Sequence, residues 1–221
     1  MSKSGTTCVA RRANDTIVKR ILQQLKIEND EDRLALNRFI LDLPELNDFV
    51  MEYINECCKD LNRTKFGLTT LRDIVIARPP YRQRSLEMLL EFAKFRDDTI
   101  RSLAIRLIVN RLYLNDTQSL QEISIFIEEF ATTLLYELIS LNPQSAMTDK
   151  TETKEEANKE VSEEEVRRYL FLYCALCTKK HELLSNLIDV YTQMSPNVKK
   201  IMHQECLPTI RAIGLHSPYI S

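Results

Sequence analysis

Glycine is scarce in this chain, which has 3 glycines and 7 prolines among 221 residues. A β-sheet protein needs many tight turns, and the hairpin turns between its strands favour glycine. Leu, Ile, Glu, Lys and Arg, which are common in helices, are abundant. The composition therefore argues against an all-β architecture and favours long helices joined by short connections.

Long hydrophobic runs are missing as well. No apolar stretch is long enough to cross a lipid bilayer, and the first residues do not form a secretory signal. We therefore expect no membrane contact and a reducing, intracellular compartment. In such a compartment the six cysteines are expected to remain free thiols.

A strong excess of one charge is also absent, since the net charge is −2. The acidic part lies between Asp149 and Glu165, where eight acidic residues and three lysines give −5 and leave +3 for the rest of the chain. This is far below the positive charge of a typical DNA-binding domain. We expect any nucleic-acid contact to be indirect or weak.

The patterns of common active sites are not found. There is no Gly-rich phosphate loop and no strained nucleophile turn. The acidic residues lie beside lysines and arginines on predicted helix surfaces, where they form ion pairs between successive turns. We predict no enzymatic activity, no catalytic residue, no cofactor and no small-molecule substrate.

One set of residues has the spacing of a metal site. Cys174 and Cys177 form one pair and His203 and Cys206 another, and together they could bind zinc tetrahedrally. The three cysteines, however, lie on apolar stripes of predicted helices, where buried cysteine acts as a small hydrophobic residue. We predict core packing and no bound metal, with a small metal-stabilised module as the alternative.

The dominant pattern is apolar residues at helical spacing, i, i+3, i+4 and i+7. It predicts an all-α fold of about ten helices in antiparallel pairs, which suits either a bundle or an α-solenoid. The segment Asp97–Ala104, described below, favours stacked pairs that form one HEAT-like domain over residues 14–221. Residues 1–13 are predicted to be disordered. Residues 142–161, which are polar and lack aromatic side chains, are predicted to form a flexible acidic loop.

Individual residues predict where several helices begin and end. Ser162 and Glu165 have the spacing of a capping box, which predicts a helix start after the acidic loop. Pro44 is expected in the first turn of its helix, the helical position that proline tolerates. Pro79 and Pro80 are expected to end another helix.

The segment Asp97–Ala104 is typical of the second helix of a HEAT repeat. It reads Asp-x-x-Ile-Arg-x-x-Ala, and a weaker version occurs at Ser195–Lys200. In this interpretation Asp97 caps the helix, Arg101 reaches the neighbouring repeat and Ala104 allows close helix approach. Several such repeats must stack to bury a continuous core.

Two blocks, at about Leu68–Leu112 and Val166–Pro218, resemble the symplekin family, and they occur in the order found in that family. They cover roughly half of the chain, and Leu41–Arg63 resembles the family more weakly. The segments that carry the resemblance are Leu71–Pro79, Leu86–Leu90, Ile100–Ala104, Tyr169–Tyr173, Lys180–Leu184, Asp189–Tyr191 and Ile210–Pro218.

The resemblance implies a HEAT-repeat scaffold of mRNA 3′-end processing in the nucleus. Its implied partners are protein subunits of the cleavage and polyadenylation machinery. Symplekin-like proteins are much longer than this chain, which would then be an internal fragment or a short form. The alternative is an unrelated all-α HEAT protein of adaptor or transport type in the cytoplasm.

Basic side chains are the candidate partner-binding residues, and they are interpreted as a ridge that meets an acidic partner or an RNA backbone. The competing interpretation is an ordinary solvated face. Aromatic residues do not alternate with these charges, so a surface for stacking nucleic-acid bases is not supported. Phe171 lies off the apolar stripe of its helix and is expected to contact a second partner or repeat. The candidate basic residues are Arg78, Arg82, Arg84, Arg106, Arg111, Lys199 and Lys200.

Overall fold

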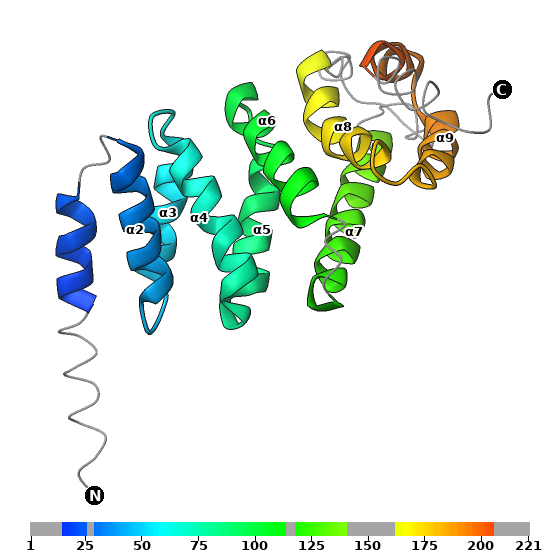
Figure 1. Ribbon diagram of the computed structural model, residues 1–221. Coiled ribbons are helices and arrows are strands. Elements are labelled where there is room, and N and C mark those ends of the chain that lie inside the picture. Colours follow the sequence, from blue (N-terminus) through cyan, green and yellow to red (C-terminus); the bar gives the residue numbers. More distant parts are fainter. Residues whose placement is uncertain (1–14, 26–28, 114–117, 141–161, 206–221) are drawn as a thin grey trace, which may run out of the picture. The chain divides into compact units, whose positions relative to one another are not determined.

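The structure, a computed structural model, describes residues 15–25, 29–113, 118–140 and 162–205. Every regular element in these ranges is helical, and ten α-helices lie within them (Figure 1). The all-α, solenoid-like fold predicted from the sequence is confirmed. The predictions for residues 1–13 and for the acidic loop at 142–161 fall outside the described residues. None of the described helices is both long enough and apolar enough to cross a bilayer.

Two compact units make up the chain, residues 1–89 and residues 90–221. The sequence predicted one domain over residues 14–221. The division falls inside α5 (Arg82–Phe92), a helix with a regular apolar pattern. A division within a helix produces no change in composition or periodicity, so sequence patterns do not reveal it.

The first unit is built around α4 (Thr64–Ala77), which packs most extensively against α3 (Asp48–Lys59) and also contacts α2 (Asp30–Asp42). A helix at 15–24 precedes them, and a short 3-10 turn, η1 (Pro79–Tyr81), follows α4. As predicted, α4 ends just before the two prolines. The core of the first unit consists of apolar side chains that are almost completely buried, among them Leu36, Ile40, Val50, Met51, Ile54, Leu68, Leu71, Ile74 and Val75.

Side-chain caps determine where the helices of this unit begin. The Asn29 side chain accepts a hydrogen bond from the Asp32 N–H at 2.8 Å, and the Asp32 carboxylate accepts one from the Asn29 N–H at 3.2 Å. The Asn47 side chain accepts one from the Val50 N–H at 3.0 Å, so α3 begins at Asp48. Pro44 lies in the connection before this cap, and the prediction that it starts the helix was wrong.

Gly67 allows α4 to approach α3 unusually closely. A Cβ atom at this position would lie 2.7 Å from both the backbone N and the Sγ of Cys58, and 3.0 Å from the carbonyl carbon of Cys57. Cys57 and Cys58 are both fully buried. Because backbone atoms cannot yield as a flexible side chain can, only glycine fits here without a shift of one helix.

The second unit contains α6 (Asp98–Leu107), α7 (Gln118–Ser140), α8 (Glu163–Cys177), α9 (Leu183–Gln193) and a helix at 196–205. The end of α6 widens into a π-helical turn, η2 (Ile108–Leu112). α7 packs most extensively against α8 and also contacts α9, and α6 contacts α8.

The predicted capping box at the start of α8 is confirmed. The Ser162 hydroxyl accepts a hydrogen bond from the Glu165 N–H, and the Glu165 carboxylate accepts one from the Ser162 N–H, both at 3.2 Å. Three glutamates, Glu163 to Glu165, occupy the first turn, where the positive end of the helix dipole favours negative charge. The sequence alone therefore predicted where this helix begins.

Replacing Gly67 by valine is expected to destabilise the first unit by about 1–3 kcal/mol, the usual cost of overfilling a packed contact. The branched side chain would meet the backbone of α3, and the helices would have to move apart. Urea denaturation of the full chain followed by far-UV circular dichroism measures the change. The control is Ala35→Val on the exposed side of α2, which costs only about 0.7 kcal/mol or less in helix propensity. Equal midpoints for the two variants would contradict the close approach.

Candidate functional site

The seven basic residues predicted to bind a partner are divided between the two units. Arg78, Arg82 and Arg84 belong to the first unit, and the other four belong to the second. Within each unit, the structure separates side chains that are used inside the fold from side chains that point to solvent.

Arg78 is used inside the first unit, where it completes the C-terminal end of α2. Its guanidinium donates hydrogen bonds to the carbonyl groups of Leu41, of Leu43 at 2.7 Å and of Pro44 at 3.4 Å. The last carbonyl groups of a helix have no partner within the helix. Arg78 supplies one, and its guanidinium also lies 5.5 Å from the ring centre of Tyr81. It is therefore a structural residue.

Three other predicted residues also have partners in their own unit. Arg82 Nε donates to the Val75 carbonyl at 3.0 Å, near the end of α4. Arg84 forms an ion pair of 2.7 Å with Asp48 on the surface, an arrangement that contributes little to stability. Lys199 donates to the Thr192 carbonyl at 3.0 Å and lies over the Tyr191 ring.

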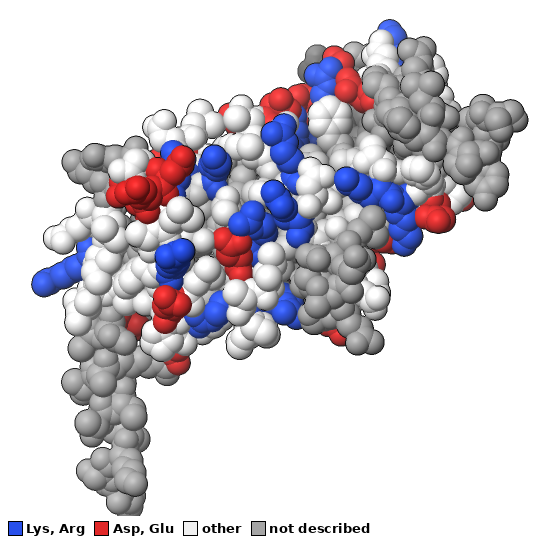
Figure 2. Space-filling model, viewed as in Figure 1, with Lys and Arg blue, Asp and Glu red and all other residues white. Residues whose placement is uncertain are grey.

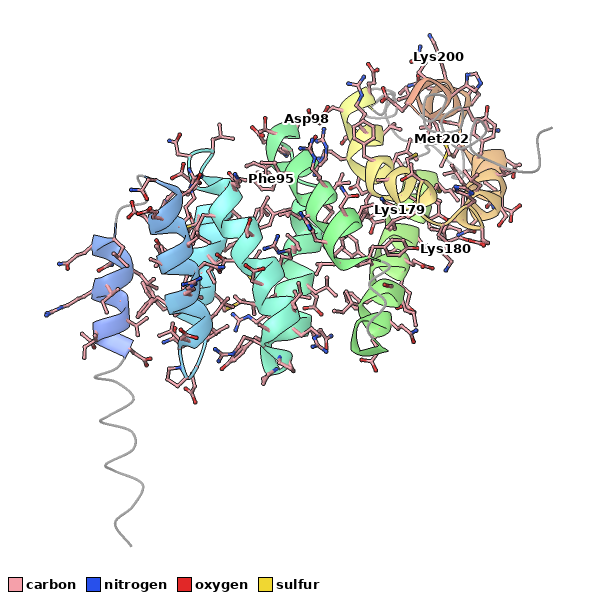
Figure 3. The ribbon with its side chains drawn as sticks, viewed as in Figure 1. Phe95, Asp98, Lys179, Lys180, Lys200 and Met202 are labelled. Atoms are coloured by element: carbon pink, nitrogen blue, oxygen red, sulfur yellow. The ribbon has the colours of Figure 1, made fainter. Side chains whose placement is uncertain are left out.

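Arg106, Arg111 and Lys200 are exposed, and all three belong to the second unit. Arg111 lies on the π-helical turn and Lys200 on the helix at 196–205, where Figure 3 labels it. Arg106 borders a depression of the surface, a groove between α6 and α8.

The α6–α8 groove has a volume of about 520 Å³. Each wall uses residues spaced along one face of a helix, and Glu205 from the helix at 196–205 closes one side. One wall is made by Ser102, Ile105 and Arg106 of α6 and Val109 and Asn110 of η2. The other is made by Phe171, Cys174 and Ala175 of α8 and Thr178 and Lys179 of the turn that follows it.

The floor of the groove is apolar and its rim is positively charged. Val109 and Cys174 are each only 6% exposed, and Phe171 is half-buried. Arg106 and Lys179 are exposed, and within the described parts of the chain neither side chain has a hydrogen bond or an ion pair. Figure 2 shows several basic side chains over this part of the second unit.

The acidic residue of the groove is neutralised within the fold. Arg167 donates a hydrogen bond from Nε to Glu205 Oε1 at 3.0 Å, and its Nη2 forms an ion pair with the same oxygen at 2.9 Å. Consistent with this contact, the hydrogen bond to Glu205 raises the pKa of Arg167 above its ordinary value. The charges of the groove that remain for a partner are therefore the two cations, Arg106 and Lys179.

Arg101 holds α6 and α8 in place beneath the groove. Its side chain is 1% exposed, and its guanidinium forms ion pairs with Glu164 at 2.7 Å and Asp98 at 2.6 Å. It also donates to the carbonyl groups of Phe95 at 2.9 Å and Arg96 at 3.3 Å, in the turn before α6. One side chain therefore links the turn, α6 and α8.

The other two residues assigned to repeat packing lie in the same helix. The Asp97 carboxylate accepts a hydrogen bond from the Ile100 N–H at 3.1 Å and is the N-terminal cap of α6. Ala104 is completely buried. Arg168 adds a second link from α8 to the turn, because its Nε donates to the Lys94 carbonyl at 2.9 Å.

A half-buried acidic group holds the chain just after the C-terminal end of α8. Lys180 lies 2.9 Å from both carboxylate oxygens of Glu128 on α7, and the Tyr113 hydroxyl donates to the same carboxylate at 2.7 Å. Burial first and Glu128 second raise the pKa of Tyr113, so the phenol remains a proton donor at neutral pH. Lys180 is thus anchored, whereas the adjacent Lys179 is exposed and lines the groove; both residues are labelled in Figure 3.

The alternative metal-binding residues are only partly described. Cys174 and Cys177 are buried on α8, His203 is exposed, and Cys206 lies outside the described residues. In the described ranges no three His, Cys, Asp or Glu side chains lie close enough together to hold a metal ion.

Sequence analysis missed Lys179 and did not foresee that Phe171 would line a groove. Counting from Phe171 shows the signal that was available: residues 171, 174, 175, 178 and 179 follow one helical face. Residue spacing could not predict which helix would lie opposite that face.

No protein-family model matches the chain, and no solved structure matches it.

Replacing Arg101 by methionine is expected to lower the stability of the chain by about 2 kcal/mol, because the Phe95 and Arg96 carbonyl groups lose their donor. Methionine keeps most of the buried volume, so the loss reports on hydrogen bonding. Urea denaturation measures it. Arg106→Met on the same helix is the matched control, since Arg106 is exposed and should change stability by no more than about 0.5 kcal/mol. Two variants of equal stability would refute the role of Arg101.

Proposed function

We propose that this chain is a non-enzymatic protein-interaction scaffold in nuclear pre-mRNA 3′-end processing, and that it binds subunits of the cleavage and polyadenylation machinery. The observation that supports the proposal is where the segments resembling the symplekin family lie. Ile100–Ala104 is on α6 and Tyr169–Tyr173 is on α8. These helices pack together and form the two walls of the groove.

The occupant of the groove is a helical segment of a partner subunit that has an apolar face bordered by acidic residues. A helix bound in a groove inserts side chains at i, i+3, i+4 and i+7. Those side chains would pack against Val109, Phe171 and Cys174, which form the apolar floor. Burial of apolar surface would supply most of the affinity.

The rim cations select the partner by charge. Arg106 and Lys179 lie on opposite walls, so acidic residues on both sides of the partner helix can each meet a cation. Complementary charges at a rim chiefly increase the association rate and suppress partners of the wrong charge. A basic helix would be repelled by the same two residues.

The proposed mechanism is geometric. The groove has its charges at the rim and an apolar floor, an arrangement suited to binding a surface. A scaffold that holds two subunits at once makes their encounter intramolecular and raises their effective concentration. The rigidity of the α6–α8 pair, which comes from Arg101 and Arg168, keeps the two walls at a constant separation.

A pull-down from nuclear extract tests the proposal. Tagged wild-type chain should recover subunits of the cleavage and polyadenylation machinery, identified and quantified by mass spectrometry. The double variant Arg106→Glu, Lys179→Glu should recover about tenfold less, because like charges would then meet across the rim. Its folding is checked by circular dichroism.

The control is the double variant Arg20→Glu, Arg38→Glu, which makes the same change in charge at two exposed positions of the first unit. It should recover as much as the wild type. Recovery of cytoplasmic adaptor or transport proteins in place of processing subunits would refute the nuclear role. Equal loss with both double variants would show that the groove is not the binding site.

A further inference from the structure

The α6–α8 groove has a direction, because its two walls run parallel. Arg101, near the start of α6, forms an ion pair of 2.7 Å with Glu164 in the first turn of α8. At the opposite end, Asn110 on η2 and Lys179 after α8 line the same groove. We call the end where both helices begin the amino end of the groove and the other end its carboxyl end. Figure 3 labels Asp98 near the amino end and Lys179 near the carboxyl end.

The amino end of the groove presents carboxylates to solvent. Asp98, Glu163 and Glu164 are exposed, and the Asp98 side chain is 72% accessible. The arginines paired with these carboxylates lie deeper, since Arg101 is 1% exposed and Arg167 is partly buried. The positive charges therefore point into the fold, and the surface at this end is negative.

The acidic side chains continue the helical faces that line the groove. Asp98 is four positions before Ser102 on α6, and Glu164 is seven positions before Phe171 on α8. Residues at these spacings lie on the same side of a helix. Arg96 is also exposed, but it lies in the turn before α6 and belongs to neither face. A partner that extends along the groove therefore reaches carboxylates at the amino end.

The two cations of the groove lie toward its carboxyl end. Arg106 is in the last turn of α6, and Lys179 follows the end of α8. Asp98 and Arg106 are eight positions apart, about 12 Å along a helix with a rise of about 1.5 Å per residue. Glu164 and Lys179 are fifteen positions apart, about 22 Å on the same basis. Negative and positive charges are thus separated along the length of the groove.

We propose that the partner helix lies antiparallel to α6 and α8. Acidic residues in its first turns meet Arg106 and Lys179, and basic residues in its last turns meet Asp98 and Glu164. This inference rests on the proposed function, in which the groove binds a helix, and it specifies that helix further. The partner is a helix of roughly four turns, about 16 residues, whose charge changes from negative to positive along its length.

The helix dipole explains why the antiparallel direction suits an ordinary helix. The dipole favours acidic residues in the first turn and basic residues in the last turn, and α6 itself follows this rule with Asp98 and Arg106. A partner helix with the same bias matches the groove only when it runs antiparallel to the walls. In the parallel direction its acidic residues would lie against Asp98 and Glu164. An RNA backbone, which is negative throughout, would meet the same carboxylates and is disfavoured for that reason.

Two designed peptides of this length test the direction by nuclear magnetic resonance of the full chain. Both have the same leucine stripe at helical spacing, and each has a nitroxide amino acid near its N-terminus. The acid-first probe has glutamates in its first half and lysines in its second, and the base-first probe has the reverse order. The acid-first probe should broaden the backbone amide signals of Asn110 and Lys179. The base-first probe should broaden those of Asp98 and Glu164, because its charges match the groove only in the parallel direction.

Fluorescence anisotropy with labelled acid-first probe measures the contribution of the cations. The double variant Arg106→Glu, Lys179→Glu should bind it about tenfold more weakly, and Arg20→Glu, Arg38→Glu should bind it as the wild type does. If both probes place their N-termini at the same end, charge does not set the direction, and this inference fails while the groove remains a helix-binding site. If neither probe binds saturably, the groove proposed under the function fails, and the inference fails with it.

Discussion

The buried guanidinium of Arg101 is the interaction on which the second unit depends most. It is held by two carboxylates, Asp98 and Glu164, and by two backbone carbonyl groups of the turn before α6. A buried charge without partners would be strongly unfavourable. Arg101 can contact these four partners only when the turn, α6 and α8 take one arrangement. The groove is the outer surface of that arrangement.

In the first unit the corresponding constraint is steric. Gly67 brings α4 against the backbone of α3 at Cys57 and Cys58, and Arg78 then closes the end of α2 with three hydrogen bonds to carbonyl groups. Both residues act on the backbone of a neighbouring helix. An arginine that has this role is not available to a partner, however accessible it looks in a linear sequence.

The groove proposed as the binding surface of the second unit combines two kinds of contact. It offers an apolar floor with a cation on each wall and would suit a helix with acidic borders.

The sequence by itself determined the helical class, the start of α8 at its Ser162–Glu165 box, and the cap of α6 at Asp97, because apolar spacing and capping are local properties. Tertiary structure alone decided the division inside α5. It also decided which basic side chains form contacts within the fold and which remain exposed. Arg78 directly follows α4 and Arg106 lies in the last turn of α6, yet one meets the carbonyl groups of α2 and the other borders a groove. That difference depends on which helix lies opposite, and contacts between residues distant in sequence are not encoded in local spacing.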